Sequence, residues 1–600
     1  IPCFEKAIQI NPNYAEAYKN YGITLNEQGE LEKAIHYFEQ AIKINPDLIS
    51  SKLNLAKGLS NLKKYDQAIR IFENALTENP GCHEIISYYV PLLFQLGRYQ
   101  SALQIIQEGL VKFPDHNILT RLYAQALNCL GEIEESAEAY KRIFQKYPDD
   151  GHIIAGLIQF SGWDKKSNSR RLFDNFCEVV SKDNSVLKKS KVKEYDSMAA
   201  LIGMGRAGAL FLHSLFDGHP EFATLPGYFF KGWFCEENWE ILKPDAQDPS
   251  WREKLAQDIC YHFRPQFDAS SKKNVIGKPN GETSWLAADI GFANMGRENS
   301  QALKLDEKLF KDKFLESLKH YEIVDSKACF ELIHRAFDEA FRNHGMVKRP
   351  NKAIFYHIHN PDHYEYANFI NNYPNAKVLC ILRHPIQMLE SWIAKHFIGI
   401  KESSDIYENN VRFTTIVEII TNFFDYFCNP LNSIAETKGV KLEDIKKESQ
   451  KVLPQVASWL GVENSSILYE SEFMNLKYSR PSNSFNMISG YDTASIDAPV
   501  GRYFGKRDIT ILETLFWPIL SVYRYTDASE KNFINDLNQI RPWLNEPLQI
   551  EKDLYGKIQI DNICVQETGN YIRMHAKLVS VWENLRVNRA YPHVMKPIFP

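Results

Sequence analysis

A glycine-rich turn between a predicted strand and a predicted helix has residues suited to binding an anion. The apolar run Met198–Ile202 predicts a buried strand, and Ala209–Phe216 predicts an amphipathic helix. Backbone N–H groups and the helix dipole converge on such a turn, and Arg206 adds a guanidinium that suits phosphate or sulfate. A tight structural turn with a surface arginine would give the same pattern. The expected anion-binding residues are Gly203, Met204, Gly205, Arg206, Ala207, Gly208, Ala209 and Leu210.

The turn lacks the residues of two common phosphate-binding loops. No Lys-Ser or Lys-Thr pair follows its glycines, which excludes the nucleoside-triphosphate loop GxxxxGK[ST]. It is also a poor dinucleotide fingerprint, because Ala209 or Leu210 stands where the last glycine is expected. The anion bound here is therefore expected to belong to another class of ligand.

A second strand-to-helix junction predicts a second anion site. Lys377–Leu382 predicts a buried strand that runs into the turn Arg383-His384-Pro385, and a helical pattern follows. Ser391 lies about two helical turns beyond Arg383. An arginine at a strand end and a hydroxyl on the next helix could together hold a phosphate, although an Arg-His-Pro turn taken alone is more often structural.

Taken in order, the two junctions resemble the sulfotransferase family. The first resembles the family's 5′-phosphosulfate loop, and the second, RHPIQMLES from Arg383 to Ser391, resembles its 3′-phosphate motif RxPxxxxxS. The resemblance covers about residues 196–540. It implies that the donor is 3′-phosphoadenosine 5′-phosphosulfate (PAPS), with no metal. It also implies that sulfuryl transfer to a hydroxyl acceptor leaves 3′-phosphoadenosine 5′-phosphate (PAP).

The turn departs from the family at two positions. Ala207 and Ala209 stand where family members carry serine or threonine. Each missing hydroxyl removes a hydrogen bond to a charged ligand, worth roughly 1.5–3 kcal/mol. A catalytically impaired sulfotransferase fold that serves as a docking scaffold is therefore an alternative. A different phosphate-loop transferase, such as a small-molecule kinase, is a further one, although the missing Lys-Ser/Thr pair speaks against it.

A histidine after a third predicted strand is the candidate general base. Ala353–His357 predicts the strand, which leads into His359-Asn360-Pro361. Cytosolic sulfotransferases carry KTHLP at a comparable distance before the 3′-phosphate motif, and its histidine is the base, which implies this role for His359. Sulfuryl transfer needs a group that takes the acceptor's proton, and histidine titrates near neutrality. The alternatives are a hydrogen-bonded strand-end histidine and a metal pair with His357, for which no third ligand is evident.

Two further cations are expected near the donor. Lys231 lies in the aromatic stretch Pro226–Phe234 and could steady the bridging oxygen, although a lone lysine is more often exposed. Arg502 lies where the family has a basic segment over the 3′-phosphate, which implies that role here. The aromatic stretch either lines an acceptor pocket or packs in the core. The catalytic glutamate of the protein-tyrosine sulfotransferases is missing from the start of this stretch, so the mechanism of that subfamily is not carried over.

The first 150 residues repeat with a period of 34. This period, with small and aromatic residues in register, resembles tetratricopeptide repeats, each of which is a pair of helices. We expect four full repeats and the second helix of a partial one. Stacked repeats form a concave face, which implies a docking groove for a protein or peptide, while a spacer or a dimerisation surface is the alternative. The prolines that mark the period are Pro12, Pro46, Pro80, Pro114 and Pro148.

These patterns divide the chain into four parts. We expect the repeat array over residues 1–150, capping and linking helices over residues 151–195, the sulfotransferase-like domain over residues 196–540, and an extension of unknown role over residues 541–600. The fold class expected is an α-solenoid followed by an α/β domain. A mostly parallel sheet would carry the phosphate motifs at the carboxyl ends of its strands, where such sheets bind ligands.

Composition narrows the classes of protein further. The 600 residues carry a net charge of −5, which argues against a nucleic-acid-binding protein. The ten cysteines include no CxxC pair, as expected for free thiols in a reducing compartment, and we therefore expect a cytoplasmic protein. No apolar run approaches the ~20 residues of a membrane span. No signal peptide is evident, although the chain opens at Ile1 within a repeat.

Overall fold

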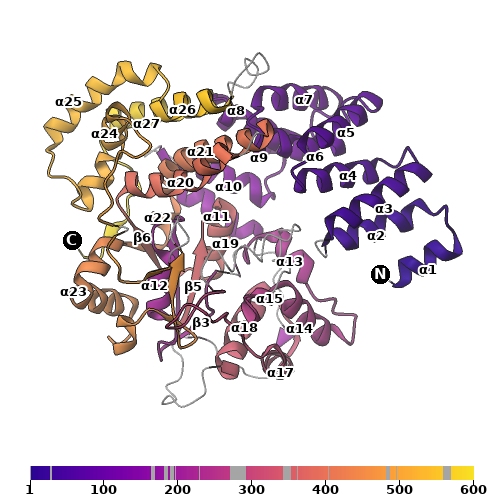
Figure 1. Cartoon of the computed structure of the whole chain (residues 1–600), viewed down its shortest axis with the longest axis horizontal. Coiled ribbons are helices and arrows are strands. Elements are labelled where there is room, and N and C mark those ends of the chain that lie inside the picture. Colours follow the sequence, from indigo (N-terminus) through magenta and orange to yellow (C-terminus); the bar gives the residue numbers. More distant parts are fainter. Residues whose placement is uncertain are drawn as a thin grey trace.

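The computed structural model shows a row of helices that leads into a domain built on a parallel sheet (Figure 1). None of the helices in the part of the chain that the structure describes is long and apolar enough to cross a membrane. The described residues are 2–27, 30–163, 169–180, 187–188, 195, 197–228, 230, 232–270, 292–341, 353–360, 362–402, 405–481, 487–494, 496–558 and 569–599.

Helix pairs at a 34-residue spacing form the N-terminal row. The first helix, α1 (Pro2–Ile10), is the second half of a partial repeat, and four full pairs follow it. Between paired helices the chain turns through Lys63, Gly97 and Gly131, whose φ angles of 62°, 73° and 84° are left-handed. Gly29, the equivalent residue of the first pair, lies outside the described residues. The pairs are α2 (Ala15–Glu27) with α3 (Leu31–Ile44), α4 (Ile49–Asn61) with α5 (Tyr65–Glu78), α6 (His83–Gln95) with α7 (Tyr99–Lys112), and α8 (Asn117–Cys129) with α9 (Ile133–Lys146).

An apolar helix joins the array to the domain. This helix, α10 (Gly151–Phe160), packs against α9 on one side and against α19 (His363–Asn372) on the other. Ile153 belongs to the hydrophobic cluster at the end of the array, whereas Ile154 belongs to the core of the domain. A helix that is apolar on all sides is buried on all sides, so α10 covers the last face of the array and is part of the domain core as well.

Six strands form the central sheet in the order β12-β7-β6-β2-β5-β3, and every pairing is parallel. The mostly parallel sheet expected from the sequence is therefore present. The central strands β2 (SMAALIG) and β6 (KVLCIL) are apolar without alternation, because helices cover both faces of such sheets, whereas β7 (ETKGVK), nearer the edge, is polar and partly exposed. The strands are β2 (Ser197–Gly203), β3 (Phe222–Thr224), β5 (Ala353–His359), β6 (Lys377–Leu382), β7 (Glu436–Lys441) and β12 (Lys596–Pro597).

The other elements of the domain surround this sheet or extend from it. Three small antiparallel pairs are β1 (Leu187–Lys188) with β4 (Tyr321–Ile323), β8 (Glu472–Phe473) with β9 (Leu476–Lys477), and β10 (Ser479–Pro481) with β11 (Met487–Ser489). The helices are η1 (Ser161–Trp163), α11 (Ser169–Val180), α12 (Ala209–Phe216), α13 (Glu236–Leu242), α14 (Trp251–His262), α15 (Arg264–Phe267), α17 (Glu307–Leu318), α18 (Ser326–Phe341), α20 (Pro385–Glu402), α21 (Ile406–Phe427), α22 (Leu431–Ile434), α23 (Leu442–Leu460), η3 (Ser466–Tyr469), α24 (Lys506–Val522), α25 (Glu530–Ile540), η4 (Arg541–Asn545), α26 (Gln549–Ile558) and α27 (Gly569–Asn588).

The C-terminal stretch, whose role the sequence leaves open, contributes to the domain. β12 adds an edge strand to the sheet, with Lys596 paired to Lys438 and Pro597 paired to Gly439. α27 packs against α21, and Trp582 of α27 donates a hydrogen bond of 2.7 Å to the carbonyl oxygen of Leu537. Residues beyond 540 therefore complete both the sheet and the helical layer.

Two helices of the domain also contact the array. α21 packs against α6, and α27 packs against α8. Arg573 of α27 donates to the hydroxyl oxygen of Tyr99 at 2.9 Å and to the carboxylate of Glu418 at 3.1 Å. Farther along α21, Lys63 of the array and Glu408 form an ion pair at 2.8 Å. The array is therefore attached to the domain through the turns of its repeats as well as through α10.

Candidate active site

The strand order brings three of the predicted site segments to one edge of the sheet. β2 lies between β5 and β6, and Gly203 at its end pairs with His359 on one side and Ile381 on the other. Because parallel strands end at the same edge, the glycine-rich turn, His359 and Arg383 all follow neighbouring strand ends. In this order the glycine-rich turn after β2 lies between His359, the last residue of β5, and Arg383, which follows β6.

The glycine-rich turn has the backbone geometry of a tight strand-to-helix junction. Arg206 and Gly208 both have left-handed φ angles, 69° and 95°, and Gly208 directly precedes α12. A left-handed arginine costs of order 1–3 kcal/mol, and such strain gathers at functional sites. A Cβ atom on Gly208 would lie 2.7 Å from Leu442 Cδ1, so the turn also lies close to the first residue of α23. The first N–H groups of α12 face this turn, because helix N-termini leave them without partners in the helix.

Asn360 binds one of the N–H donors of the turn. Its side-chain Oδ1 accepts a hydrogen bond of 2.8 Å from the backbone N–H of Gly205. Asn360 has a left-handed φ of 49°, which asparagine tolerates better than most residues do. An amide oxygen therefore occupies a position where the expected ligand would place a phosphate or sulfate oxygen. Sequence reasoning missed this contact, and the only local signal was the asparagine before Pro361.

Trp392 of α20 covers the turn from the other side. Its indole N–H donates to the carbonyl oxygen of Gly205, and a Cβ atom at position 205 would overlap the indole ring. Ala207 and Ala209 are buried, 1% and 5% exposed. The two segments predicted to bind anions are therefore in direct contact, and glycine is required at position 205 by this close approach rather than by its φ angle.

The candidate base stacks on an aromatic side chain. The rings of His359 and Tyr228 lie 4.1 Å apart and are parallel within 8°. His357 lies on the same side of β5, with its ring 5.7 Å from that of His359, as the strand spacing predicts. Burial, and then the charge of His213, holds the pKa of His357 well below its usual range, so this imidazole is neutral near pH 7.

The aromatic stretch that contains Tyr228 divides between two roles. Phe230, Trp233 and Phe234 are buried, so the core interpretation holds for them. Tyr228 and the buried Phe230 also line a small cavity together with Gln266 and other residues, and Tyr228 stacks there on His359. Lys231, the proposed partner of the bridging oxygen, lies outside the described residues.

A carboxylate from α23 holds the turn that is predicted to form the second anion site. Glu443 accepts hydrogen bonds from the backbone N–H of His384 at 3.0 Å and from the hydroxyl of Tyr525 at 2.8 Å. These bonds fix the turn that carries Arg383, which is 7% exposed at the end of β6. Burial and the neighbouring charge of Arg383 lower the pKa of His384 to about 4, so it is neutral near pH 7. The local positive charge is therefore that of Arg383.

Ser391 and the segment that carries Arg502 are linked through Glu390, the residue before Ser391 in the motif RHPIQMLES. Ser391 is half-buried on α20, and Glu390 beside it accepts hydrogen bonds from the backbone on both sides of Arg502. Arg502 itself is exposed, on the segment that precedes α24. Among the residues that the structure describes, no group of three His, Cys, Asp or Glu side chains could hold a metal ion.

Comparison with known proteins identifies the N-terminal part of the chain. Models of the tetratricopeptide repeat family match residues 3–36 and 62–126. The chain therefore contains tetratricopeptide repeats, as its period predicts. No curated protein sequence matches the chain.

Solved structures of repeat proteins resemble part of the chain. YrrB, described as a TPR protein with an unusual peptide-binding site, is 16% identical, with 30% of this chain and 93% of YrrB covered and a TM-score of 0.24. A fragment of MamA from Desulfovibrio magneticus RS-1 is 18% identical, with 28% and 97% covered and a TM-score of 0.25. Yeast Tom70 is 17% identical, with 29% and 38% covered and a TM-score of 0.27. Each likeness covers less than a third of this chain.

Proposed function

We propose that the domain is a sulfotransferase that moves a sulfuryl group from PAPS to a hydroxyl acceptor. The observation that supports this most is the register of three strands, which sets the glycine-rich turn, His359 and Arg383 at neighbouring strand ends. Two anion sites on one sheet edge suit a nucleotide with a phosphosulfate at one end and a phosphate at the other. The resemblance to sulfotransferases implies that this nucleotide is PAPS.

Each proposed role follows from the position of the residue. Arg206 and the N–H groups at the start of α12 would hold the phosphosulfate, and Arg383 with Ser391 would hold the 3′-phosphate. His359 would take the proton of the acceptor hydroxyl. As the acceptor oxygen bonds to sulfur, the bond between sulfur and the bridging phosphate oxygen breaks, and PAP leaves with the electron pair. Charge that grows on that oxygen would be stabilised by Arg206, and by Lys231 if it is placed as the sequence suggests.

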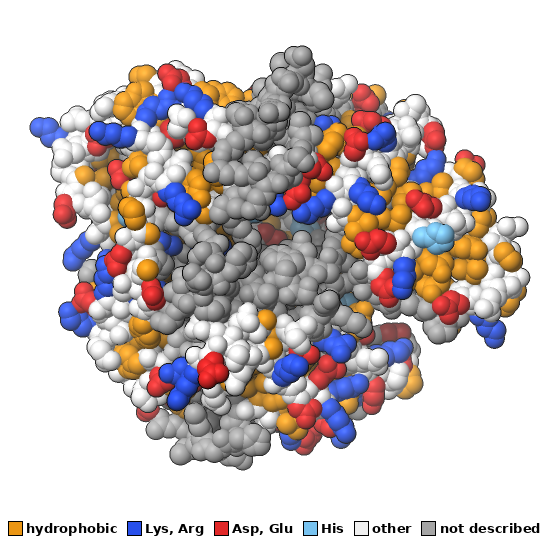
Figure 2. Space-filling view, in the orientation of Figure 1, with side chains coloured by type: hydrophobic (Ala, Val, Ile, Leu, Met, Phe, Trp, Pro, Cys, Tyr) orange, Lys and Arg blue, Asp and Glu red, His pale blue; other side chains and the backbone are white. Residues whose placement is uncertain are grey.

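We propose further that the array docks a protein or peptide, which could carry the acceptor hydroxyl. Tetratricopeptide repeats supply a broad stacked surface for such a partner. Figure 2 shows hydrophobic side chains gathered over the N-terminal helices of the array, where Ile10 and Tyr14 are exposed. A cytoplasmic location is proposed on the cysteine pattern alone.

A docking scaffold without catalysis is the second candidate. Ala207 and Ala209 supply no hydroxyl to a ligand, and Asn360 holds the N–H of Gly205. A ligand at this turn must either displace the Asn360 side chain or bind with one donor fewer. Under this alternative the domain holds the array in place and does not transfer a sulfuryl group from PAPS.

Calorimetric titration with PAP tests the proposal. PAP lacks the sulfuryl group, so its binding tests only whether the nucleotide site exists. We expect micromolar binding by the full chain, and a loss of tenfold or more for Arg383→Ala, because one charge-assisted interaction is worth roughly 1.5–3 kcal/mol. Arg142→Ala removes an exposed arginine of the array (77% exposed) and should leave the affinity unchanged.

Three results would count against the enzyme or against its proposed nucleotide site. No heat of binding at millimolar PAP would leave the scaffold as the remaining function. Tight binding that Arg383→Ala does not alter would mean that the nucleotide lies elsewhere. Binding of PAP without transfer from radiolabelled PAPS to any tested hydroxyl acceptor would favour the catalytically impaired form.

A further inference from the structure

A segment that precedes α24 is hydrogen-bonded to two side chains of α20. We call this segment, residues 496–504, the strap. Gln387 Nε2 of α20 donates to the carbonyl oxygens of Ile496 at 3.2 Å and of Ala498 at 2.7 Å. These two bonds hold the first half of the strap, and its second half is held one turn farther along the same helix.

Glu390 holds the second half with one oxygen. Its Oε1 accepts hydrogen bonds from the backbone N–H groups of Gly501 and Tyr503, both at 3.0 Å. Gln387 and Glu390 are three residues apart, and side chains at this spacing share one face of a helix. Four hydrogen bonds from a single helix face therefore fix the path of the strap.

The carboxylate of Glu390 is buried and is stabilised by its hydrogen bonds to the strap. Glu390 is 6% exposed, and a carboxylate so buried is costly unless hydrogen bonds stabilise it. The two N–H groups converge on it across a bend at Gly501, whose φ of 103° side chains rarely adopt. Tyr503 then packs edge-on against Phe397 of α20, with ring centres 5.1 Å apart.

Arg502 lies between the two N–H groups that Glu390 holds. It is exposed, its guanidinium lies 5.3 Å from the ring centre of Tyr503, and no described residue forms an ion pair with it. Glu390 directly precedes Ser391, so the backbone of the strap on both sides of Arg502 is held at the turn of α20 that carries the candidate phosphate ligand. A long cation held at its backbone and along its side chain is preorganised for an anion.

We propose that Glu390 and Gln387 are positioning residues that fix the strap and so hold Arg502 in place for the 3′-phosphate, the contact that the family resemblance implies for Arg502. This inference rests on the proposed function, because it assigns the second anion site to that phosphate. Neither side chain touches the nucleotide in this account. They keep Arg502 in one position, so their effect on affinity should appear only with ligands that carry the 3′-phosphate.

Titration of two ligands tests the inference. PAP and adenosine 5′-monophosphate differ only in the 3′-phosphate. Arg502→Ala should weaken PAP binding about tenfold to a hundredfold, the loss expected for one charge-assisted contact, and should leave the binding of the monophosphate unchanged. Glu390→Ala should give a similar loss although Arg502 is intact. Glu390→Gln retains an amide oxygen that can accept both N–H groups, so it should restore most of the preference.

The double variant separates positioning from general damage. If Glu390 acts through Arg502, Glu390→Ala with Arg502→Ala should bind PAP no more weakly than Arg502→Ala alone. Additive losses would overturn the inference, as would a 3′ preference that survives in both single variants. Hydrogen exchange at the amides of Gly501 and Tyr503 should quicken in Glu390→Ala, and slow exchange there would equally overturn it. Failure of the wild type to bind either ligand would instead remove the proposed function, and this inference with it.

Discussion

At the scale of single residues, Gly205 is where the two predicted anion-binding segments meet. Its N–H binds the side chain of Asn360, and its carbonyl oxygen binds the indole of Trp392. Both backbone polar groups of Gly205 are thus paired with side chains. Asn360 directly follows β5, and Trp392 lies on α20. These contacts fix the backbone of the turn, and the Asn360 side chain occupies one N–H donor that a ligand would otherwise bind.

We therefore expect Gly205→Ala to damage the turn. The added Cβ atom would overlap the Trp392 ring, and such overpacking costs about 1–3 kcal/mol. PAP affinity should fall at least tenfold, and the melting temperature should fall as well. Gly58→Ala is the matched control, because this helix-interior site in α4 leaves 3.4 Å to the nearest atom and alanine favours helices. Normal PAP binding by Gly205→Ala would show that the ligand does not use this turn.

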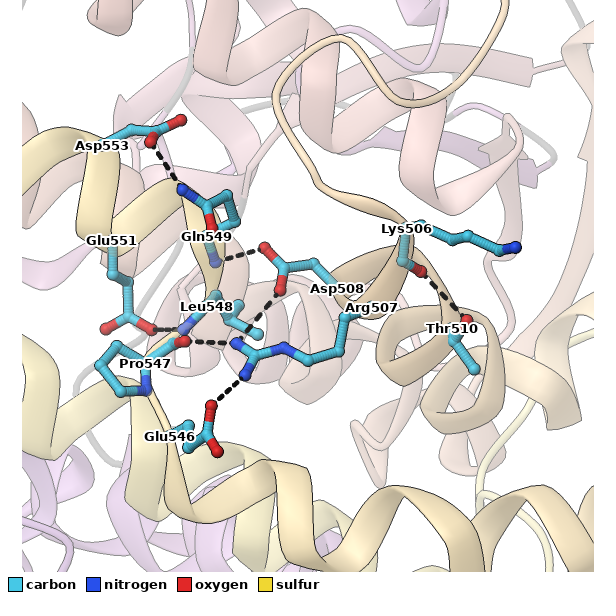
Figure 3. Close-up of polar contacts among 10 residues, drawn as sticks. All are labelled: Lys506, Arg507, Asp508, Thr510, Glu546, Pro547, Leu548, Gln549, Glu551 and Asp553. Carbon is cyan, nitrogen blue, oxygen red and sulfur yellow. Dashed lines mark hydrogen bonds and ion pairs between the residues drawn. The ribbon is translucent and has the colours of Figure 1, made fainter.

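At the scale of elements, α20 is the helix that the rest of the site depends on, and the junction of α24 and α26 supports it. α26 packs against both α20 and α21. Figure 3 shows the polar contacts of the junction. Arg507 of α24 binds the Glu546 carboxylate at 2.6 Å, and Asp508 accepts from the backbone N–H of Gln549 at 2.6 Å. Glu551 Oε2 accepts from the backbone N–H of Leu548 at 2.8 Å.

The buried acid at this junction should make stability depend on pH. Burial, and less strongly the charge of Asp508, raises the pKa of Glu551 to about 8. The folded chain therefore keeps this proton between about pH 4.5 and pH 8, whereas the unfolded chain releases it. Stability must fall as pH rises through that window, and the contribution is intact below it. The neutral form suits the site, since Glu551 is 2% exposed.

Glu551→Gln should abolish this dependence. The variant should match the wild type in free energy of unfolding near pH 5 and exceed it by a few kcal/mol near pH 9, because each unit of pKa shift is about 1.4 kcal/mol. Denaturant unfolding at the two pH values measures the difference. Glu546→Gln, at an acid whose side chain is 60% exposed, is the control and should show no such gain. A Glu551→Gln curve parallel to the wild-type curve would mean that Glu551 is ionised in the folded chain.

At the scale of the whole molecule, the repeats are attached to the domain through the turns between paired helices. A Cβ atom on Gly131 would overlap Ala576 of α27, and one on Gly97 would lie 2.6 Å from Asn570 Nδ2. The buried hydroxyl of Tyr99 accepts from Arg573 in the same contact. One edge of the array is thus covered by the domain, and the array keeps its exposed surface for a partner.

Gly131→Ala should loosen this attachment. Gly81→Ala is matched to it in backbone strain, since both glycines have left-handed φ angles (84° and 68°), but Gly81 contacts only the array. Both variants should lower the stability of the array by about 1 kcal/mol or more. Only Gly131→Ala should also speed hydrogen exchange in α27, residues 569–588. Equal exchange in the two variants would show that α27 is held independently of the repeats.

Local patterns in the sequence were sufficient for much of this organisation. The period of 34 identified the repeats, and β6 and α12 have the bounds predicted from an apolar run and an amphipathic run, although α12 is buried along almost its whole length. Hydrophobic periodicity is set within a dozen residues, so it can be read without knowing what each segment packs against. The roles of His359 and Arg502 came from family resemblance and stay predictions, as does the donor.

Only the tertiary structure decided which segments meet. The strand order puts β2 between β5 and β6, and the C-terminal β12 enters the same sheet. Gly205 is 155 residues from Asn360 and 187 from Trp392, and Glu390 is 111 residues from Gly501. Side-chain hydrogen bonds over such separations depend on the order in which strands pair and on where the following helices cross. That order minimises exposed apolar surface over the whole chain, so no local stretch of sequence encodes it.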